Sequence, residues 1–359
     1  MCRGFSHLIS PVKVFGWPDD LCHISWWRVE VARTMENADK EEWMFQFTTE
    51  QKVCEVGGVK FGGQPGEYPT VTCSSIFQKG DKVFEGKRKE GFDEKKATEL
   101  LRNQDRLWQE TGVPGMADIV ANTGEEFKTY IDFVTSVSDM PFCIDAWVMK
   151  PKLEGAAYCA EKGLLDRMFY NSLTVWEQDL ETEIREIAQI GVKHVLLVAY
   201  DQEDQMPSGR IKGTQKLLDA IENTGAQFES VFVDTSVMNG PATALCGMAN
   251  KLIKEKWGFP TGSAPSNGSY MWKHARESWG FKGWAAADAA LESLAAFLYH
   301  DMIFSGPMAG ASRVMPAVAM ANAFQATAVF SQTGRLPQDK NHPLYKLFPE
   351  FVEQLKTSL

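Results

Sequence analysis

Eight short apolar runs, each of the length of one β-strand, recur along the chain between residues 70 and 306. They occupy residues 70–77, 116–121, 141–147, 167–171, 194–201, 229–235, 259–264 and 300–306. Their starts lie 25 to 46 residues apart, which leaves room for a crossover helix between successive parallel strands. Eight strand–helix units predict an α/β fold, a (β/α)₈ TIM barrel, and a doubly wound open sheet is the alternative.

The segments around these runs support the same architecture. Two short apolar stretches flank Gly57-Gly58, which predicts an N-terminal β-hairpin because both turn positions tolerate positive φ. Between the fourth and fifth runs, apolar residues recur every three or four positions, as on one face of a helix. They are Trp176, Leu180, Ile184, Ile187 and Ile190. The tail, residues 343–359, is predicted as one terminal helix.

The first 43 residues differ from the rest and contain four of the 11 tryptophans without a sustained period. We interpret residues 1–43 as an irregular N-terminal extension, or as sequence upstream of a true start at Met44. A partner-binding arm with exposed aromatic residues is the alternative. The barrel domain is then expected to span residues 44–359.

Charge and cysteine content exclude several classes of protein. The chain has 37 basic and 47 acidic side chains, a net charge of −10, which argues against nucleic-acid binding through bulk positive charge. No run of about 18 apolar residues suggests a membrane span. Seven scattered cysteines without a C-x-x-C pair indicate reduced thiols, and therefore a cytoplasmic location.

Short oxygen-bearing side chains stand at or just after six of the predicted strands. They are Asp118, Asp145, Asn171-Ser172, Asp201, Asp234-Thr235 and Ser266-Asn267. Any one of them could be a helix N-cap or a turn residue. In a barrel, however, all strand ends meet at the carboxyl-terminal face, where active sites lie. A shared ring of hydrogen-bond acceptors is therefore predicted there.

A ring of acceptors with few basic residues suits a neutral ligand that is rich in N–H donors, and not a phosphate. A reduced pterin has this character, because its N3–H and 2-amino groups lie side by side. One carboxylate can accept both in a bidentate contact. An asparagine amide both donates and accepts, which fits a ring nitrogen whose protonation changes during a reaction.

Several motifs resemble the MtrH family, the MtrH subunits of tetrahydromethanopterin S-methyltransferase, over about residues 44–325. The longest is VGGVKFGGQPGEYPT at residues 56–70, and the shorter ones include FCID at 142–145 and YNS at 170–172. DAW at 145–147 and PSNGSYMW at 265–272 are most similar to one branch of the family. That branch is the bacterial methylcorrinoid:tetrahydrofolate methyltransferases of glycine betaine demethylation.

The resemblance implies a pterin-binding barrel that moves a methyl group from a methylated corrinoid protein to N5 of tetrahydrofolate. Position by position, it assigns pterin binding to Asp118, Asp145, Asn171, Asp201 and Asn267, with Asn267 as the catalytic residue. Some relatives carry an asparagine where this chain has Val148. A homodimer is also implied.

Other signals bear on cofactors and partners. The base-off cobalamin motif Asp-x-His-x-x-Gly is absent, so we expect a partner protein to carry the corrinoid. The lack of a compact Cys/His cluster predicts no bound metal. Lys150, Lys152, Arg210, Lys212 and Lys273 follow predicted strands, either as solvated charges or as contacts for an anionic folate tail.

Two alternative functions remain open from the sequence. One is a tetrahydromethanopterin-dependent MtrH subunit of a larger complex. Tetrahydromethanopterin and tetrahydrofolate present the same ring edge, so one sequence hardly distinguishes which of them is bound. The other is a non-catalytic barrel that binds or assembles partners. An aldolase or hydrolase on this scaffold would need a Lys or His at a strand end. His194 and His300 instead stand at strand starts, which argues against these enzyme classes.

Overall fold

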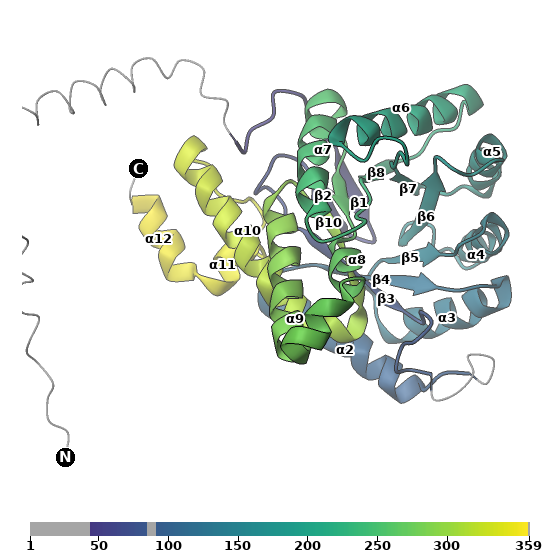
Figure 1. The fold of residues 1–359 in the computed structure, drawn as a ribbon, viewed down its shortest axis with the longest axis horizontal. Helices are drawn as coiled ribbons and strands as arrows, with labels where there is room; N and C mark the ends of the chain where they lie inside the picture. Colours follow the sequence, from purple (N-terminus) through teal and green to yellow (C-terminus); the bar gives the residue numbers. More distant parts are fainter. Residues whose placement is uncertain (1–43, 85–90, 358–359) are drawn as a thin grey trace, which may run out of the picture. The chain divides into compact units, whose positions relative to one another are not determined.

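The computed structural model describes residues 44–84 and 91–357, and in it eight parallel strands close into a barrel (Figure 1). β10 pairs with both β9 and β3, which closes the ring and shows that the open-sheet alternative was wrong. The strands are β3 (Val71–Ile76), β4 (Gly115–Val120), β5 (Phe142–Asp145), β6 (Met168–Thr174), β7 (His194–Val198), β8 (Ser230–Asp234), β9 (Thr261–Ser263) and β10 (Met302–Pro307). Each of the eight predicted runs contains or overlaps one of them.

Helices cover the outside of the barrel, and at least one follows every strand (Figure 1). They are α2 (Glu94–Thr111), α3 (Gly124–Val137), α4 (Met149–Glu161), α5 (Leu180–Ile190), α6 (Pro207–Thr224), α7 (Ala242–Trp257), α8 (Pro265–Tyr270), α9 (Lys273–Phe297) and α10 (Ala311–Thr333), with the 3₁₀ turn η2 (Met308–Gly310) before α10. The (β/α)₈ prediction is therefore confirmed.

The predicted hairpin is present as β1 (Val53–Val56) and β2 (Val59–Gly62), joined at Gly57-Gly58. Phe61 is fully buried, with its ring centroid 6.2 Å from that of Phe169 and 6.0 Å from that of Phe232. The amide of Gly57 donates to the carbonyl of Asp166, just before β6 begins. The hairpin thus closes the amino-terminal end of the barrel, and burying a Phe side chain in this way contributes roughly 1.5–3 kcal/mol. The opposite end is left for function.

Two helix boundaries differ from the prediction. Helix α5 begins at Leu180, so Trp176 lies in the preceding loop and is half exposed. The tail forms two helices, α11 (Pro343–Leu347) and α12 (Pro349–Thr357), instead of one. Phe348 between them has φ −134° and ψ 50°, because the proline that follows disfavours the helical conformation there. Residues 1–43, predicted as an extension, lie outside the described residues.

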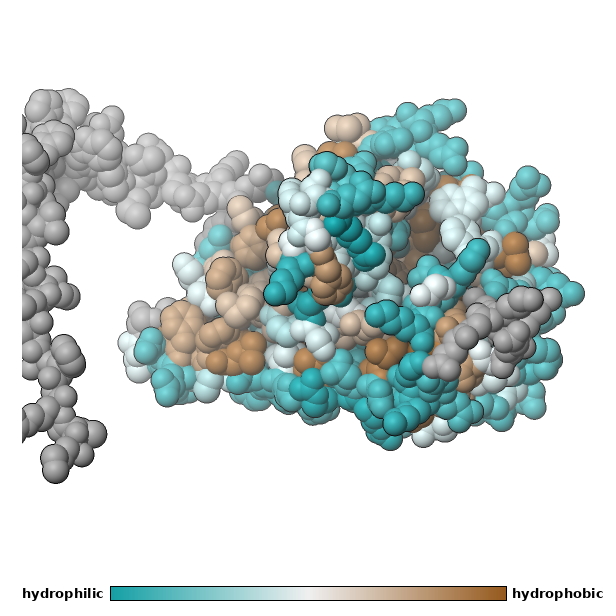
Figure 2. All heavy atoms as spheres, turned by 60° about the horizontal axis from the view of Figure 1, so that its bottom comes forward, coloured by the Kyte–Doolittle hydropathy of each residue, from teal (hydrophilic) through white to brown (hydrophobic). Residues whose placement is uncertain are grey.

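One helix of the described chain, Met308–Thr333, is long and apolar enough by length and composition to cross a membrane. However, 61 % of its most apolar window is buried inside the structure, which is typical of a core helix. Large apolar side chains nevertheless stay exposed on α9 and α10, among them Leu294, Met320 and Phe324. Figure 2 shows hydrophobic residues gathered on the half of the molecule that carries α9 to α12, while hydrophilic residues dominate the other half.

Candidate functional site

The inward-facing side chains of the barrel change from apolar to polar along each of several strands. Side chains alternate between the inside and the outside of a strand, so inward positions are two residues apart. A lower layer of Cys73, Met116, Cys143, Phe169 and Phe232 packs on the hairpin. Two residues further on stand Ser75, Asp118, Asp145, Asn171 and Asp234. The strand register sets Asp118 beside Ser75, and Asn171 beside Asp145. A polar ring therefore lies at the carboxyl-terminal end.

Asp118, Asp145 and Asn171 form the centre of this ring. The Asn171 amide donates from Nδ2 to Oδ1 of Asp118 over 3.2 Å, and both residues are buried. Burial, together with the nearby Asp145 carboxylate, raises the pKa of Asp118 well above its usual range. Burial also raises the pKa of Asp145, to about 6, while the charge of Lys152 acts in the opposite direction. At neutral pH the arrangement favours the proton on Asp118 and the negative charge on Asp145.

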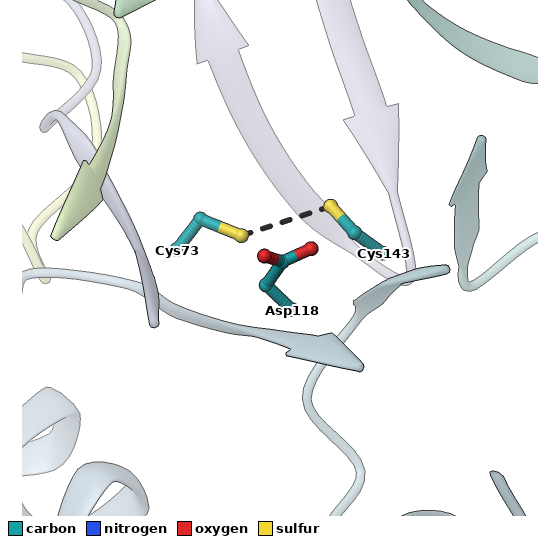
Figure 3. Close-up of side chains that lie close together, drawn as sticks. All are labelled: Cys73, Asp118 and Cys143. Carbon is teal, nitrogen blue, oxygen red and sulfur yellow. Dashed lines mark hydrogen bonds between the residues drawn. The ribbon is translucent and has the colours of Figure 1, made fainter. Parts of the chain in front are cut away.

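Directly below, the thiols of Cys73 and Cys143 approach each other to 3.6 Å, and both sulfur atoms lie within 4.8 Å of a carboxylate oxygen of Asp118 (Figure 3). Thiolates are ligands of soft metal ions, whereas a carboxylate suits harder ones. Burial raises the pKa of both thiols, and Asp118 accepts a hydrogen bond from Asn171. This trio therefore packs as the floor of the polar ring.

Asp234 belongs to the polar ring, although the pterin assignment did not include it. It ends β8, is buried, and has its pKa raised by burial to about 6. Its Oδ1 accepts a hydrogen bond from the Ser236 amide over 2.6 Å. The Arg210 guanidinium donates to the carbonyls of Thr235 and Ser236 and so fixes this loop. The sequence signal was present, since Asp234 follows an apolar run like the other strand-end residues.

In the described chain, Asp201 and Asn267 are not part of the hydrogen-bonded group at the centre of the ring. β7 ends at Val198, so Asp201 stands in the following loop, where its Oδ1 accepts from the Glu203 amide over 2.9 Å. Asn267 is exposed on the short helix α8, which follows β9. Within the part of the chain that the structure describes, no hydrogen bond or ion pair links either residue to Asp118, Asp145 or Asn171. Their role as pterin contacts stays a prediction.

Two of the five basic residues that could contact a folate tail, Lys152 and Arg210, are buried and bind other parts of the chain. Lys152 donates to the Ser172 carbonyl over 2.6 Å and pairs with the buried Glu183 at 2.8 Å. The Arg210 guanidinium donates to the backbone carbonyls of Gln205, Thr235 and Ser236. The expectation of solvated charges was wrong for both, because Lys152 connects strand β6 to helix α5 and Arg210 holds the loop after β8. Lys150, Lys212 and Lys273 are exposed.

The site should bind a donor-edged ligand better as the pH rises through about 6. Below this pH Asp145 is protonated and loses one of its two acceptor oxygens, whereas above it the full carboxylate is present. We expect the affinity for a reduced pterin to increase about tenfold between pH 5 and pH 7 and then to level off. Titration calorimetry across this range measures it. The same slope in the Asp145→Asn variant would contradict this assignment.

With this geometry established, comparison with known proteins identifies the family. The protein-family model described as the tetrahydromethanopterin S-methyltransferase MtrH subunit matches residues 49–333. The chain belongs to the MtrH family. The tetrahydromethanopterin S-methyltransferase H subunit from Methanopyrus kandleri is 32 % identical over 315 residues, covering 82 % of this chain and 96 % of that relative. The same subunit from Methanosarcina barkeri is 30 % identical over 324 residues, covering 85 % of this chain and all of that relative.

Solved structures support the fold of this MtrH-family chain. Dihydropteroate synthase from Xanthomonas albilineans, solved with 4-aminobenzoic acid, has a TM-score of 0.53 and covers 76 % of this chain and 98 % of its own. The Yersinia pestis enzyme in a complex with a sulfonamide drug has a TM-score of 0.54 and covers 77 % of this chain and all of its own. Their sequence identities are 14 % and 12 %, so the likeness concerns the barrel itself.

Proposed function

We propose that this chain is a methyltransferase that exchanges a methyl group between N5 of a reduced pterin and the cobalt of a corrinoid on a partner protein. The observation that carries the proposal is the acceptor group of Asp118, Asp145 and Asn171 at the open end of an MtrH-family barrel. It offers a carboxylate, a neutral acid and an amide side by side. This is the set that a flat ring with a donor edge requires.

The reaction needs little covalent chemistry from the protein. In one direction, the N5 lone pair attacks the methyl group of methyl-cobalt(III), the carbon–cobalt bond breaks, and its electron pair stays on cobalt(I). The methylated N5 then releases its proton to solvent. The chain's task is to hold N5, methyl and cobalt in line and to keep water out. Asp145 and Asn171 would hold the ring edge. Asn267, which can donate or accept, would accommodate N5 with or without its proton.

The identity of the pterin is the finer part of the proposal. The relatives are named as tetrahydromethanopterin enzymes, which favours that pterin over the tetrahydrofolate that the sequence predicted. We therefore propose tetrahydromethanopterin first, with tetrahydrofolate and the metabolism of methylated amines such as glycine betaine as the competing assignment. Both pterins present the same donor edge to Asp145.

The proposed setting follows from the same relatives. They are named as subunits, so we propose that the chain works in a complex that includes the corrinoid carrier. The exposed apolar side chains on α9 and α10 suit an association surface, which supports the homodimer that the sequence predicted. A cytoplasmic location stays a prediction.

A spectroscopic assay tests the function. The purified chain is mixed with methylcobalamin and either tetrahydromethanopterin or tetrahydrofolate under anaerobic conditions, and the visible spectrum follows the conversion to cob(I)alamin. We expect conversion with at least one pterin, and the faster acceptor identifies the substrate. Pterin binding without conversion, also with a co-purified corrinoid partner, would favour the non-catalytic barrel instead.

A further inference from the structure

The position of Asn267 depends on the short helix that carries it. The structure gives its side-chain amide no hydrogen bond within the described chain, and the residue is exposed. Helix α8 has six residues, too few to be stable by itself. The contacts of α8 with its neighbours must therefore decide where the Asn267 amide stands. The role of Asn267 itself rests on the proposed function, whereas the contacts of α8 do not.

Two hydrogen bonds connect α8 to α9. The Ser269 hydroxyl donates to Oδ1 of Asp288, and both residues are buried. The Trp284 indole donates from Nε1 to the Ser269 carbonyl over 3.0 Å, and its ring is 1 % exposed. Ser269 stands two residues after Asn267, so these bonds hold the carboxyl-terminal end of the helix.

A second connection runs from α8 to α10 through Arg313. Its Nε donates to Oδ2 of Asp288 over 2.6 Å, and one terminal nitrogen donates to the Tyr270 hydroxyl over 3.0 Å. Asp288 is fully buried, and the Arg313 side chain is 20 % exposed. One ion pair thus joins α9 and α10, and both of its members also bind α8.

One side of α8 borders a groove. Met271 and Trp272, at its end, line an apolar groove of about 850 Å³ together with Leu291 and Leu294 of α9, and all but Leu291 are exposed. Elsewhere, the Ser266 hydroxyl donates to the Phe304 carbonyl of β10 over 2.7 Å, and Gly268 packs closely against the backbone of Asn239 and Gly240. Replacing a buried ion pair by apolar residues is often neutral or stabilising for a fold, so stability alone does not explain the pair.

We propose that Asp288 and Arg313 are positioning residues, which hold α8, and with it the Asn267 amide, in place at the carboxyl-terminal end of the barrel. Among the residues that the structure describes, no hydrogen bond or ion pair links either of them to the polar ring. They act through their hydrogen bonds to Ser269 and Tyr270, and the side chain whose position depends on them is that of Asn267.

The test compares Arg313→Met with Lys254→Met. Lys254 is a matched control, because it forms an ion pair with Asp301, also at 2.6 Å, at the amino-terminal end of the barrel, and the two side chains are only 1 % and 12 % exposed. We expect Arg313→Met to lower kcat for methyl transfer about 30-fold with less than a threefold change in the pterin KM. The control should keep both constants. Ser269→Ala, which leaves the ion pair in place, should fold and lower kcat in the same way.

Two further measurements separate this inference from the proposed function. Hydrogen exchange of residues 265–272, followed by mass spectrometry, should speed up at least tenfold in Arg313→Met and Ser269→Ala and stay unchanged in Lys254→Met. In an Asn267→Ala background, the kcat effect of Ser269→Ala should disappear. Unchanged exchange, an equal loss in the control, or full additivity with Asn267→Ala would overturn the inference. If the wild-type chain transfers no methyl group, the proposed function fails, and the exchange rates still decide whether the pair holds α8.

Discussion

Replacing Asn267 with alanine is expected to lower the rate of methyl transfer about 100-fold, while pterin binding changes less than threefold. The physical reason is that N5 carries a proton in one state of the reaction and none in the other. An amide can donate to the free lone pair or accept from the N–H, whereas a methyl side chain can do neither. Because the Asn267 amide has no partner within the described chain, it is free to make this contact. Single-turnover kinetics with methylcobalamin measure the rate.

Asn122→Ala is the control for this substitution. Asn122 is also an exposed asparagine at the carboxyl-terminal end of the barrel, where it follows β4. Among the described residues its side-chain amide donates to Glu126, away from the polar ring, so its removal should leave the transfer rate intact. If Asn267→Ala turns over at the wild-type rate, Asn267 has no part in the mechanism. A loss in pterin affinity that equals the loss in rate would make it a binding residue.

The fold could be predicted from the sequence because parallel barrel strands are buried on both faces. Such strands appear as continuous apolar runs, and FCID and HVLLV mark β5 and β7 directly. Boundaries were harder to predict. Periodicity extended α5 back to Trp176, although the helix begins at Leu180, because an apolar residue in a loop can match a helical spacing by chance.

The site was only partly predictable, since spacing does not show where a side chain points. Asp118, Asp145 and Asn171 follow the two-residue alternation of inward positions. Asp201 does not, because the inward positions of β7 are Leu196 and Val198 and the strand ends there. A lysine at a helix start is typical of a solvated charge, yet the Lys152 ammonium is buried against Glu183. Only the tertiary packing of α4 and α5 brings these two groups together.

The two central carboxylates are expected to differ in their effect on pterin binding. Asp145 faces the Lys152 charge and carries the negative charge at neutral pH, whereas the pKa of Asp118 is raised further and its carboxyl keeps a proton. Asp145→Asn should therefore weaken pterin binding about 100-fold, because the amide offers one acceptor and one donor to an edge that needs two acceptors. Asp118→Asn should weaken it less than tenfold, since an amide resembles a protonated acid in shape and in its ability to donate. Titration calorimetry at pH 7.5 measures both.

The ranking of these two variants distinguishes the proton assignment from a simple count of charges. If both carboxylates were ionised, each asparagine would remove one charge and the two losses would be similar. If the proton sat on Asp145, the ranking would reverse. Asp201→Asn tests the predicted pterin contact of Asp201 separately, because the Asp201 carboxylate accepts from its own loop and stands outside the central group. A loss for Asp201→Asn as large as that for Asp145→Asn would mean that the loop after β7 closes onto the ligand.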